Sequence, residues 1–581
     1  MQIAGADDSY LIGPLREVLL ALDKFTELLN EVGLTLNESK TRIYIAESHR
    51  TDEFLEQIQA RGINEGRADE DDDNSPRGIK IYGVAIGSVP YVKLMLDAQA
   101  NKIISQGREI GNKLDPSKYP EPEIACRQAH FTLLSRCTQF KGNYWVRHVP
   151  PALTGEFAEK LDAALVDQLT QCTGINMMEL SEFTKERLRL SIKRGGMGIK
   201  FLQDVRHAEW IGGFIQGTST ILDATDQQGN RRNGRAHLPK IVNMLGEEAL
   251  DAGNLSHWET LLSRADCPIA NALRDTHGAF SEKAQRMGNL SDAPSFNNMT
   301  LAQPMTNIGF DKEGKRPAST THSISQEFDE ARAAHLRSVA KEEEHSTNSN
   351  LQESLSFLHC DRYSTLPLTA LPDRRGSCPD ILFPEIIAQI FGQPSPCCSH
   401  FEGQWIGTGG HELPVDKFGN AVASARYLPG GDFQKAHTAI QVCLLGMAKQ
   451  AGLTAFMEGT GFFAGRVAPL YLQRYMRATA SNPNCEALIP DLIVHKYKSG
   501  ASLMGEVKRN GIHAGYGNYK TNTKAVEVRA RSVKRKKIGK AKNLDRLYAA
   551  EVNSPGPFEN SLSTFFEGGV TPFCFGAFDY D

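Results

Sequence analysis

The chain has 581 residues, of which 40% are hydrophobic, a formal net charge of −4 and a mean hydropathy of −0.37. No apolar run approaches the length that spans a bilayer, which excludes an integral membrane protein, and the apolar content excludes a wholly disordered chain. At roughly 150 residues per domain we expect three or four folded units, and eleven cysteines without a secretory signal indicate reduced thiols in an intracellular, nuclear protein with no membrane partner.

The small net charge conceals two segments of opposite sign. Residues 65–73 carry six acidic side chains against the single basic Arg67, which predicts a solvated acidic loop. Residues 508–542 carry twelve basic side chains against the single acidic Glu527. A positive field of this kind attracts phosphate backbones, so we expect DNA and RNA as partners.

The N-terminal part alternates short strands with helices before helices dominate. Apolar residues at helical spacing predict a helix over 14–32, which Gly33 ends. Short strands are expected over 34–45 and 78–86, with a helix over 51–61 between them. Further helices are predicted over 90–114, 121–140, 153–172, 184–193 and 201–216.

The middle of the chain has weaker patterning. Residues 218–284 predict shorter helical pieces, and the Asn-, Ser-, Thr-, Pro- and Gly-rich stretch 285–325 predicts a linker. One exposed helix is expected over 326–341. This whole region is therefore predicted to be helical and partly disordered.

After residue 376 the pattern changes to that of an α/β domain. A helix is predicted over 433–451, and a basic, largely helical segment over 519–550. Between them, strands are expected over 453–458, 487–495 and 503–508. A helix feeding mixed strands is typical of an α/β arrangement.

Acidic and basic side chains fall on these C-terminal strands at a meaningful spacing. If the second and third strands are neighbours, Glu506 and Lys508 project from one face because side chains alternate, and Asp491 can reach the same face. Two carboxylates of this kind hold Mg²⁺ or Mn²⁺, and an ammonium nearby orients or deprotonates a water that attacks phosphorus. Glu458, at the end of the first strand, is expected to complete the group.

Pro490-Asp491 followed by Glu506-Val507-Lys508 resembles the motif of the PD-(D/E)xK nucleases, also called restriction-like endonucleases. The resemblance implies a metal-dependent DNA endonuclease whose catalytic residues are Glu458, Asp491, Glu506 and Lys508. The basic helix downstream is where DNA would be gripped. Its predicted nucleic-acid-binding residues are Arg529, Arg531, Lys534, Arg535, Lys536 and Lys537.

A second group lies at the start of the chain, where Asp7 and Asp8 sit in an apolar-flanked run. The double aspartate followed by the segment from Gly33 to Thr41 resembles two successive motifs in the palm of a non-LTR retrotransposon reverse transcriptase. The resemblance implies that Asp7 and Asp8 bind Mg²⁺ and that Lys40 donates a proton to pyrophosphate. Gly78 to Ser88 resembles the primer-grip hairpin of that family. The helical thumb and post-thumb segments of a retroelement group are similar to residues 143–147, 150–153 and 189–199.

The sequence also departs from the polymerase family. Gly5 stands where an aromatic residue is usual, and the fingers and the upstream aspartate-bearing strand are absent. Because polymerisation uses two metal ions, we expect no reverse transcriptase activity unless the missing motifs are supplied. The chain is expected to start inside a domain, as a truncated element, a truncated gene model or part of a polyprotein.

A Cys/His cluster precedes the α/β region. Cys397, Cys398, His400 and His411 resemble an incomplete zinc knuckle, so Zn²⁺ is a possible second metal. Val415 stands in the place of the last cysteine, for which Cys378, His400 or His437 are candidate replacements. The alternative is buried thiols and solvent-facing histidines.

Together these features predict a multidomain α+β and α/β protein from the C-terminal part of a non-LTR retrotransposon. The alternatives are a catalytically inactive nucleic-acid-binding scaffold and a host nuclease unrelated to retroelements. The expected parts are a partial palm (1–88), a helical thumb and post-thumb region (89–217), a helical and linker region (218–375), a knuckle-like segment (376–430), an endonuclease-like domain (431–550) and a C-terminal tail (551–581).

Overall fold

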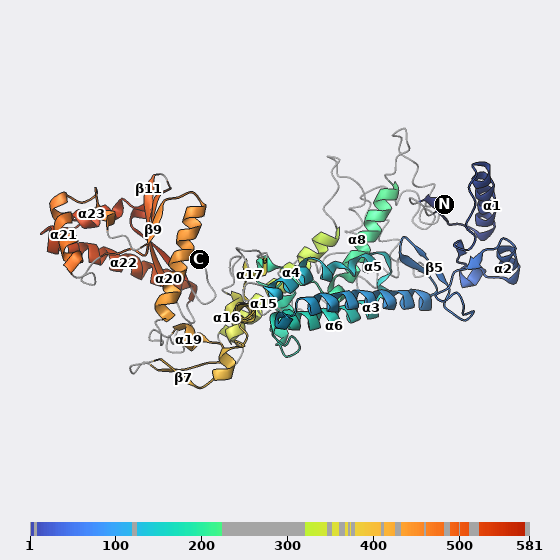
Figure 1. The fold of residues 1–581 in the computed structure, drawn as a ribbon, viewed down its shortest axis with the longest axis horizontal. Helices are drawn as coiled ribbons and strands as arrows, with labels where there is room; N and C mark the ends of the chain where they lie inside the picture. Colours follow the sequence, from blue (N-terminus) through green and yellow to red (C-terminus); the bar gives the residue numbers. More distant parts are fainter. Residues whose placement is uncertain are drawn as a thin grey trace. The chain divides into compact units, whose positions relative to one another are not determined.

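The computed structural model describes residues 2–4, 9–118, 125–222, 320–344, 351–358, 366–369, 372, 378–407, 412–424, 432–457, 461–481, 488–498, 500–509 and 522–575. They are mostly helical, with small sheets (Figure 1). The chain divides into two compact units, one built mainly from 1–191, 196–336 and 371–380, the other from 192–195, 337–370 and 381–581. Within the described ranges no helix is long and apolar enough to cross a bilayer.

The first unit opens with a small antiparallel hairpin. Strands β1 (Gln2–Ala4) and β2 (Ser9–Leu11) pair with Ile3 opposite Tyr10. Helix α1 (Leu15–Glu31) follows, and Gly33 ends it at a φ of 78°, a conformation that glycine adopts at little cost. The predicted first helix and its stop are therefore confirmed.

The strand expected over 34–45 is mostly absent. Only β3 (Arg42–Ile43) forms, in parallel with β4 (Asn64–Glu65). The preceding residues fold into a turn because Asn37 Oδ1 accepts hydrogen bonds from Ser39 Oγ and Lys40 N. Helix α2 (Asp52–Gln59) lies within the range predicted for it.

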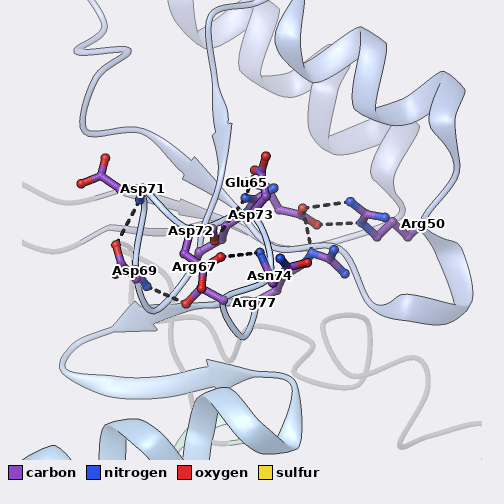
Figure 2. Close-up of polar contacts among 10 residues, drawn as sticks. Arg50, Glu65, Arg67, Asp69, Asp71, Asp72, Asp73, Asn74 and Arg77 are labelled. Carbon is purple, nitrogen blue, oxygen red and sulfur yellow. Dashed lines mark hydrogen bonds and ion pairs between the residues drawn. The ribbon is translucent and has the colours of Figure 1, made fainter.

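The acidic loop is only partly solvated. Its first acid, Glu65, has a side chain that is 6% exposed, and its carboxylate lies 3.2 Å from Nε of both Arg50 and Arg77. The other acids of the loop are exposed, and Asp69 and Asp72 accept hydrogen bonds from N–H groups two residues later (Figure 2). Glu65 is thus a buried ion-pair partner rather than part of a solvated charge run.

A second hairpin follows, formed by β5 (Gly78–Ile81) and β6 (Val84–Gly87). Its two-residue turn places Tyr82 and Gly83 at φ 50° and 80°. Gly78 and Gly87 pair across the hairpin, where the ring of Tyr91 lies against them; a Cβ at Gly78 would sit 2.2 Å from that ring. The strand expected over 78–86 is therefore divided into the two strands of a hairpin.

Between Val89 and Leu222 the described part of the first unit is mostly helical, and its helices mostly match the predicted ranges. A shared core includes Leu96, Ala100, Val146, Ala158 and Leu161. The helices are α3 (Val89–Lys113), α4 (Cys126–Arg136), α5 (Asn143–His148), α6 (Pro151–Thr173), α7 (Glu182–Leu188) and α8 (Leu202–Leu222).

The helix expected over 326–341 is longer and less exposed than predicted. Helix α15 (Thr320–Glu344) takes in the last residues of the predicted linker, and its Arg332 is 6% exposed. This guanidinium pairs with Glu186 Oε2 at 2.8 Å and Asp204 Oδ2 at 3.1 Å. The rest of that linker and the predicted helical pieces over 223–284 lie outside the described residues. Shorter helices α16 (Leu351–Leu358) and α17 (Leu366–Thr369) follow.

The described part of 378–424, for which a knuckle-like segment was predicted, consists of small elements. Helix α18 (Leu382–Phe391) ends at Gly392, which has a φ of 63°. Strands β7 (Trp405–Ile406) and β8 (Leu413–Pro414) form an antiparallel pair, and a short helix α19 (Asn420–Ser424) follows.

The main feature of the second unit is a four-stranded mixed sheet in the order β12-β11-β10-β9 (Figure 1). Strand β10 (Leu492–Lys498) runs antiparallel to both β9 (Ala455–Met457) and β11 (Ala501–Arg509). Strand β12 (Val570–Phe575) pairs in parallel with β11. The three predicted strands are confirmed, but 551–575 is not a tail, because it supplies helix α23 (Pro557–Ser563) and the edge strand.

Helices cover both faces of this sheet. Helix α20 (Asp432–Gln450) packs on the face that presents Leu492, Val494 and Leu503. Helix α22 (Asn522–Tyr548) packs on the opposite face, together with α21 (Pro469–Ser481) and α23. That second core includes Ile493, Met504, Val533, Ala541 and Leu544. Both predicted helices of the α/β region are therefore present.

Candidate functional site

Two carboxylates lie at the end of the paired run of β10 and β11. Leu492, the first residue of β10, pairs with Gly505, so Asp491 directly precedes this run and Glu506 directly follows Gly505 on β11. Met504 belongs to the core against which α22 packs. Glu506 and Lys508 follow Met504 at two-residue steps along β11, so their side chains lie on the same face as Met504. The predicted neighbouring of the two strands is confirmed.

Asp491 is held by contacts from two elements, β11 and α20. Its Oδ2 accepts a 2.6 Å hydrogen bond from Val507 N and lies 3.4 Å from His437 Nε2 on α20. Gln441, one turn further along α20, donates to the Asp491 carbonyl at 3.4 Å. Burial, and next the charge of Glu506, raise the pKa of Asp491, against the hydrogen bond from Val507 N and the nearby cations. All carboxylate contacts that Asp491 makes with described residues fall on Oδ2.

Glu506 lies deeper and contacts two lysines. The residue is 6% exposed, and its Oε1 accepts a 2.7 Å hydrogen bond from Lys508 Nζ. Its Oε2 lies 2.6 Å from Lys537 Nζ, an ion pair without the geometry of a hydrogen bond, and this buried oxygen has no hydrogen-bond partner among the described residues. Glu506 thus retains hydrogen-bonding capacity at a buried carboxylate oxygen.

Lys537 differs from the role predicted for it. It is 8% exposed and occupies the buried stripe of α22 between Val533 and Ala541, at helical spacing. Its ammonium donates to the carbonyl of Ile489 at 3.2 Å. The prediction that Lys537 belongs to the surface that binds nucleic acid is therefore wrong: its charge is directed to Glu506.

The other predicted nucleic-acid-binding residues also lie on α22. Arg531, Arg535 and Lys536 are exposed, and Lys534 is half-buried. Arg529 belongs to the same helix, but its side chain is outside the described part of the structure. One helix thus carries cations on its solvent side and one lysine that reaches the carboxylate pair.

Glu458, the third predicted carboxylate, directly follows β9 and lies outside the described residues. Among the described residues, no three His, Cys, Asp or Glu side chains gather closely enough to hold a metal ion. The described site therefore consists of two carboxylates, two lysines and a histidine.

The predicted zinc ligands are not assembled in the described part of the chain. Cys397 N donates to Glu385 Oε1 and Cys398 N to Ser395 Oγ, so backbone contacts hold this turn. Burial raises the pKa of the Cys398 thiol. His400 lies in the same turn, and His411 is not among the described residues.

The other two candidate replacements for the last zinc ligand, Cys378 and His437, lie elsewhere. Cys378 belongs to the first unit, where its N–H donates to Gln128 Oε1. His437 contacts Asp491 instead of a cysteine. This role for His437, and that of Gln441, has no strong sequence signal, because the contact depends on how α20 crosses the sheet.

The predicted palm residues are described in part. Asp7 and Asp8 fall in the connection between β1 and β2 and are outside the described residues. Lys40 is exposed, in the turn capped by Asn37. The rings of Tyr10 and Tyr82 lie 5.2 Å apart, so the first hairpin contacts the second.

Comparison of the chain with protein-family models, with curated proteins and with solved structures found no match.

Proposed function

We propose that the second unit is a metal-dependent DNA endonuclease whose site is built around Asp491 and Glu506. The observation that carries this proposal is the hydrogen bond from Val507 N to Asp491 Oδ2, which holds Asp491 beside the segment of β11 that carries Glu506, with Lys508 hydrogen-bonded to Glu506. Helix α20, the antiparallel strands β9, β10 and β11, helix α22 and the parallel strand β12 follow one another in an order that supports the α/β domain implied by the PD-(D/E)xK resemblance.

The donor set is suited to a hard divalent cation. Mg²⁺ and Mn²⁺ prefer oxygen ligands, and Asp491 and Glu506 would provide them, with Glu458 as the expected third ligand. Buried Glu506 Oε2 has no hydrogen bond, and Asp491 uses only Oδ2 in its contacts with described residues. When bound, the cation supplies positive charge that stabilises the oxygens of the scissile phosphate.

The chain's own side chains have separate tasks in this proposal. Lys508 lies at the edge of the site, with a side chain that is 32% exposed, so its ammonium can turn from Glu506 to orient the attacking water or contact a phosphate oxygen. His437 and Val507 N fix one oxygen of Asp491. The carboxylate is thereby held in one orientation before substrate arrives.

The exposed face of α22 supplies the DNA contacts. Arg531, Arg535 and Lys536 lie on the same helix as Lys537, whose ammonium reaches Glu506. Contacts from such side chains to phosphates position a duplex without reading its sequence. The proposal therefore predicts binding with little sequence preference through this helix.

The first unit is proposed to hold nucleic acid without polymerising it. The β1–β2 hairpin, with Asp7 and Asp8 in its connection, contacts the β5–β6 hairpin, which supports the resemblance to a retroelement palm and primer grip. The motif that would supply a further metal-binding aspartate is not among the given residues. We therefore place the chain with the non-LTR retrotransposon proteins as a proposal, and we expect reverse transcription only where that motif is supplied.

An inactive nucleic-acid-binding scaffold is the second candidate. It is favoured by the observation that both oxygens of Glu506 already lie within 2.7 Å of a lysine ammonium, which neutralises the carboxylate. A nuclease unrelated to retroelements would have the same second unit. A measurement of DNA cleavage distinguishes the scaffold from the proposed endonuclease, because the scaffold would not cut DNA.

The test is nicking of supercoiled plasmid by the full chain. Mg²⁺ or Mn²⁺ should support nicking and a chelator should stop it. Glu506→Gln and Lys508→Met should each reduce the rate at least about 100-fold while DNA binding persists, and Lys449→Met, an exposed lysine at the end of α20, should not. Nicking that survives both site variants would favour a contaminating nuclease, and no nicking with any divalent ion would favour the scaffold.

A further inference from the structure

We propose that Lys537 is a positioning residue of the carboxylate site, which holds the segment before Asp491 and the Glu506 side chain in fixed relation. This inference rests on the proposed nuclease function for its catalytic consequence. Its structural part, the coupling of Lys537 to Glu506, can be tested independently.

The place of Lys537 in α22 is unusual for a lysine. Its neighbours on the buried stripe, Val533, Ala541 and Leu544, are between 0% and 5% exposed and belong to the apolar core. A lysine is rarely buried to this extent unless its charge is paired, because desolvation of an ammonium is costly. A leucine or methionine at this position would fill the stripe without that cost. The buried ammonium of Lys537 therefore requires an oppositely charged group, and Glu506 provides it.

The ammonium joins two segments that carry the acids. Its Nζ donates to the carbonyl of Ile489 at 3.2 Å and lies 2.6 Å from Glu506 Oε2. Ile489 stands two residues before Asp491, and Val507, the residue after Glu506, donates its N–H to Asp491 Oδ2. One side chain of α22 thus fixes the approach of β10 and the side chain of β11. Its positive charge also offsets the repulsion between the two carboxylates.

The two lysines of Glu506 differ in exposure. The Lys537 side chain is 10% exposed, whereas that of Lys508 is 32% exposed. Lys508 therefore has room to leave Glu506 for a phosphate or a water, while Lys537 has a second tether at Ile489 and stays. This difference assigns the moving cation to Lys508 and the fixed cation to Lys537.

The first test separates positioning from DNA binding in the full chain. Lys537→Met should lower kcat for plasmid nicking by roughly 10- to 100-fold and leave KM for DNA within about twofold, because the carboxylates lose their alignment while the exposed basic face is unchanged. Lys542→Met is the matched control: it removes a lysine of the same helix that pairs with Glu559 at 3.6 Å, and both constants should stay within about twofold. An unchanged kcat, or a KM that rises with kcat constant, would overturn the proposal, the latter by making Lys537 a DNA ligand.

The second test needs no activity and therefore also covers a Lys537→Met variant that folds poorly. In a thermal-unfolding cycle, Lys537→Met should lower the midpoint by at least about 5 °C, because the buried charge of Glu506 loses a partner. Adding Glu506→Gln should recover at least about half of that shift. Additive shifts would refute the coupling of the two residues. A wild-type chain that cuts no DNA would refute the nuclease function, whatever the cycle shows.

Discussion

Asp491 Oδ2 accepts a 2.6 Å hydrogen bond from the backbone N–H of Val507, the residue that follows Glu506. The side chain of one carboxylate is thus bonded to the backbone of the strand that carries the other. An asparagine at 491 retains an oxygen that can accept this bond but loses the charge. Asp491→Asn therefore tests the charge with less disturbance of the strand pair than Asp491→Ala.

Two glycines of the second unit should respond in opposite ways to alanine. A Cβ at Gly505 would lie 2.6 Å from the Phe573 ring and 3.2 Å from Leu492 Cβ, whereas a Cβ at Gly446 in α20 would meet no atom within 4 Å. Gly505→Ala should destabilise the sheet by about 1–3 kcal/mol through overpacking. Gly446→Ala should stabilise the folded second unit by about 0.5–1 kcal/mol, because alanine has a higher helix propensity than glycine in α20.

Hydrogen exchange of peptides from β10 and β11 measures both effects. Gly505→Ala should speed exchange by between roughly 5- and 150-fold, the equivalent of the destabilisation given above. Gly446→Ala should slow it slightly. Equal exchange in Gly505→Ala and the wild type would mean that β11 and β12 are not packed as described.

Neutralising the exposed cations of α22 should weaken binding to every DNA sequence by a similar factor. In a variant with Arg531→Gln, Arg535→Gln and Lys536→Gln, the slope of log Kobs against log salt should fall in magnitude by up to about three, since each lost phosphate contact removes about 0.9. Fluorescence anisotropy with two unrelated duplexes over a salt series measures this. Lys449→Gln on α20 is the control, and a change confined to one duplex would indicate base readout instead.

The contribution of Asp162 to the stability of the first unit should fall as the pH rises from about 4 to 6. Asp162 accepts hydrogen bonds from Leu202 N at 2.7 Å and Gln203 N at 2.9 Å, and burial raises the pKa of Asp162 to about 6. Because the folded state binds this proton more tightly than the unfolded state, stability is highest below the unfolded pKa of about 3.9 and falls through the folded value. The loss reaches at most about 3 kcal/mol above pH 6.

Asp162→Asn isolates this contribution. Asparagine also serves at a helix N-terminus but has no charge to bury. Urea unfolding followed by tryptophan fluorescence should show the variant more stable than the wild type at pH 8, and the difference should shrink at pH 5. A variant less stable than the wild type at pH 8 would show that the charged form of Asp162 stabilises the helix start.

The strands and helices of the second unit could be predicted because local patterns dominate there. The helix before β9, the two strands around Gly500 and the basic helix all occur close to their expected ranges. Strand β12 was missed because it joins the sheet through a parallel pair with β11, a long-range contact with no local signal. Near the N-terminus, local side-chain bonds at Asn37 replaced most of the expected strand by a turn.

The candidate site was predicted in its motif residues and missed in their surroundings. Asp491, Glu506 and Lys508 follow from strand spacing alone. Lys537 lies in a run of four basic residues, 534–537, that suggests a solvated surface, and only its period-four relation to Val533 and Ala541 marks it as buried. Likewise, Arg332 in α15 was expected to be exposed but pairs with two acids. In both cases a charged side chain is expected to be exposed to solvent, but an ion pair with residues distant in the sequence allows it to be buried.

The central claim is that the charge of Asp491 is required to cut DNA. The most direct measurement is single-turnover nicking of supercoiled plasmid by the full chain with Mg²⁺, comparing Asp491→Asn with Asp545→Asn. Asp545 is a buried aspartate of the same unit that is 2% exposed and accepts hydrogen bonds from Phe558 N and Glu559 N, away from the site. We predict nicking by the wild type and Asp545→Asn, and a rate at least about 1,000-fold lower for Asp491→Asn. Nicking by Asp491→Asn at the wild-type rate would contradict the assignment of this carboxylate site as a nuclease.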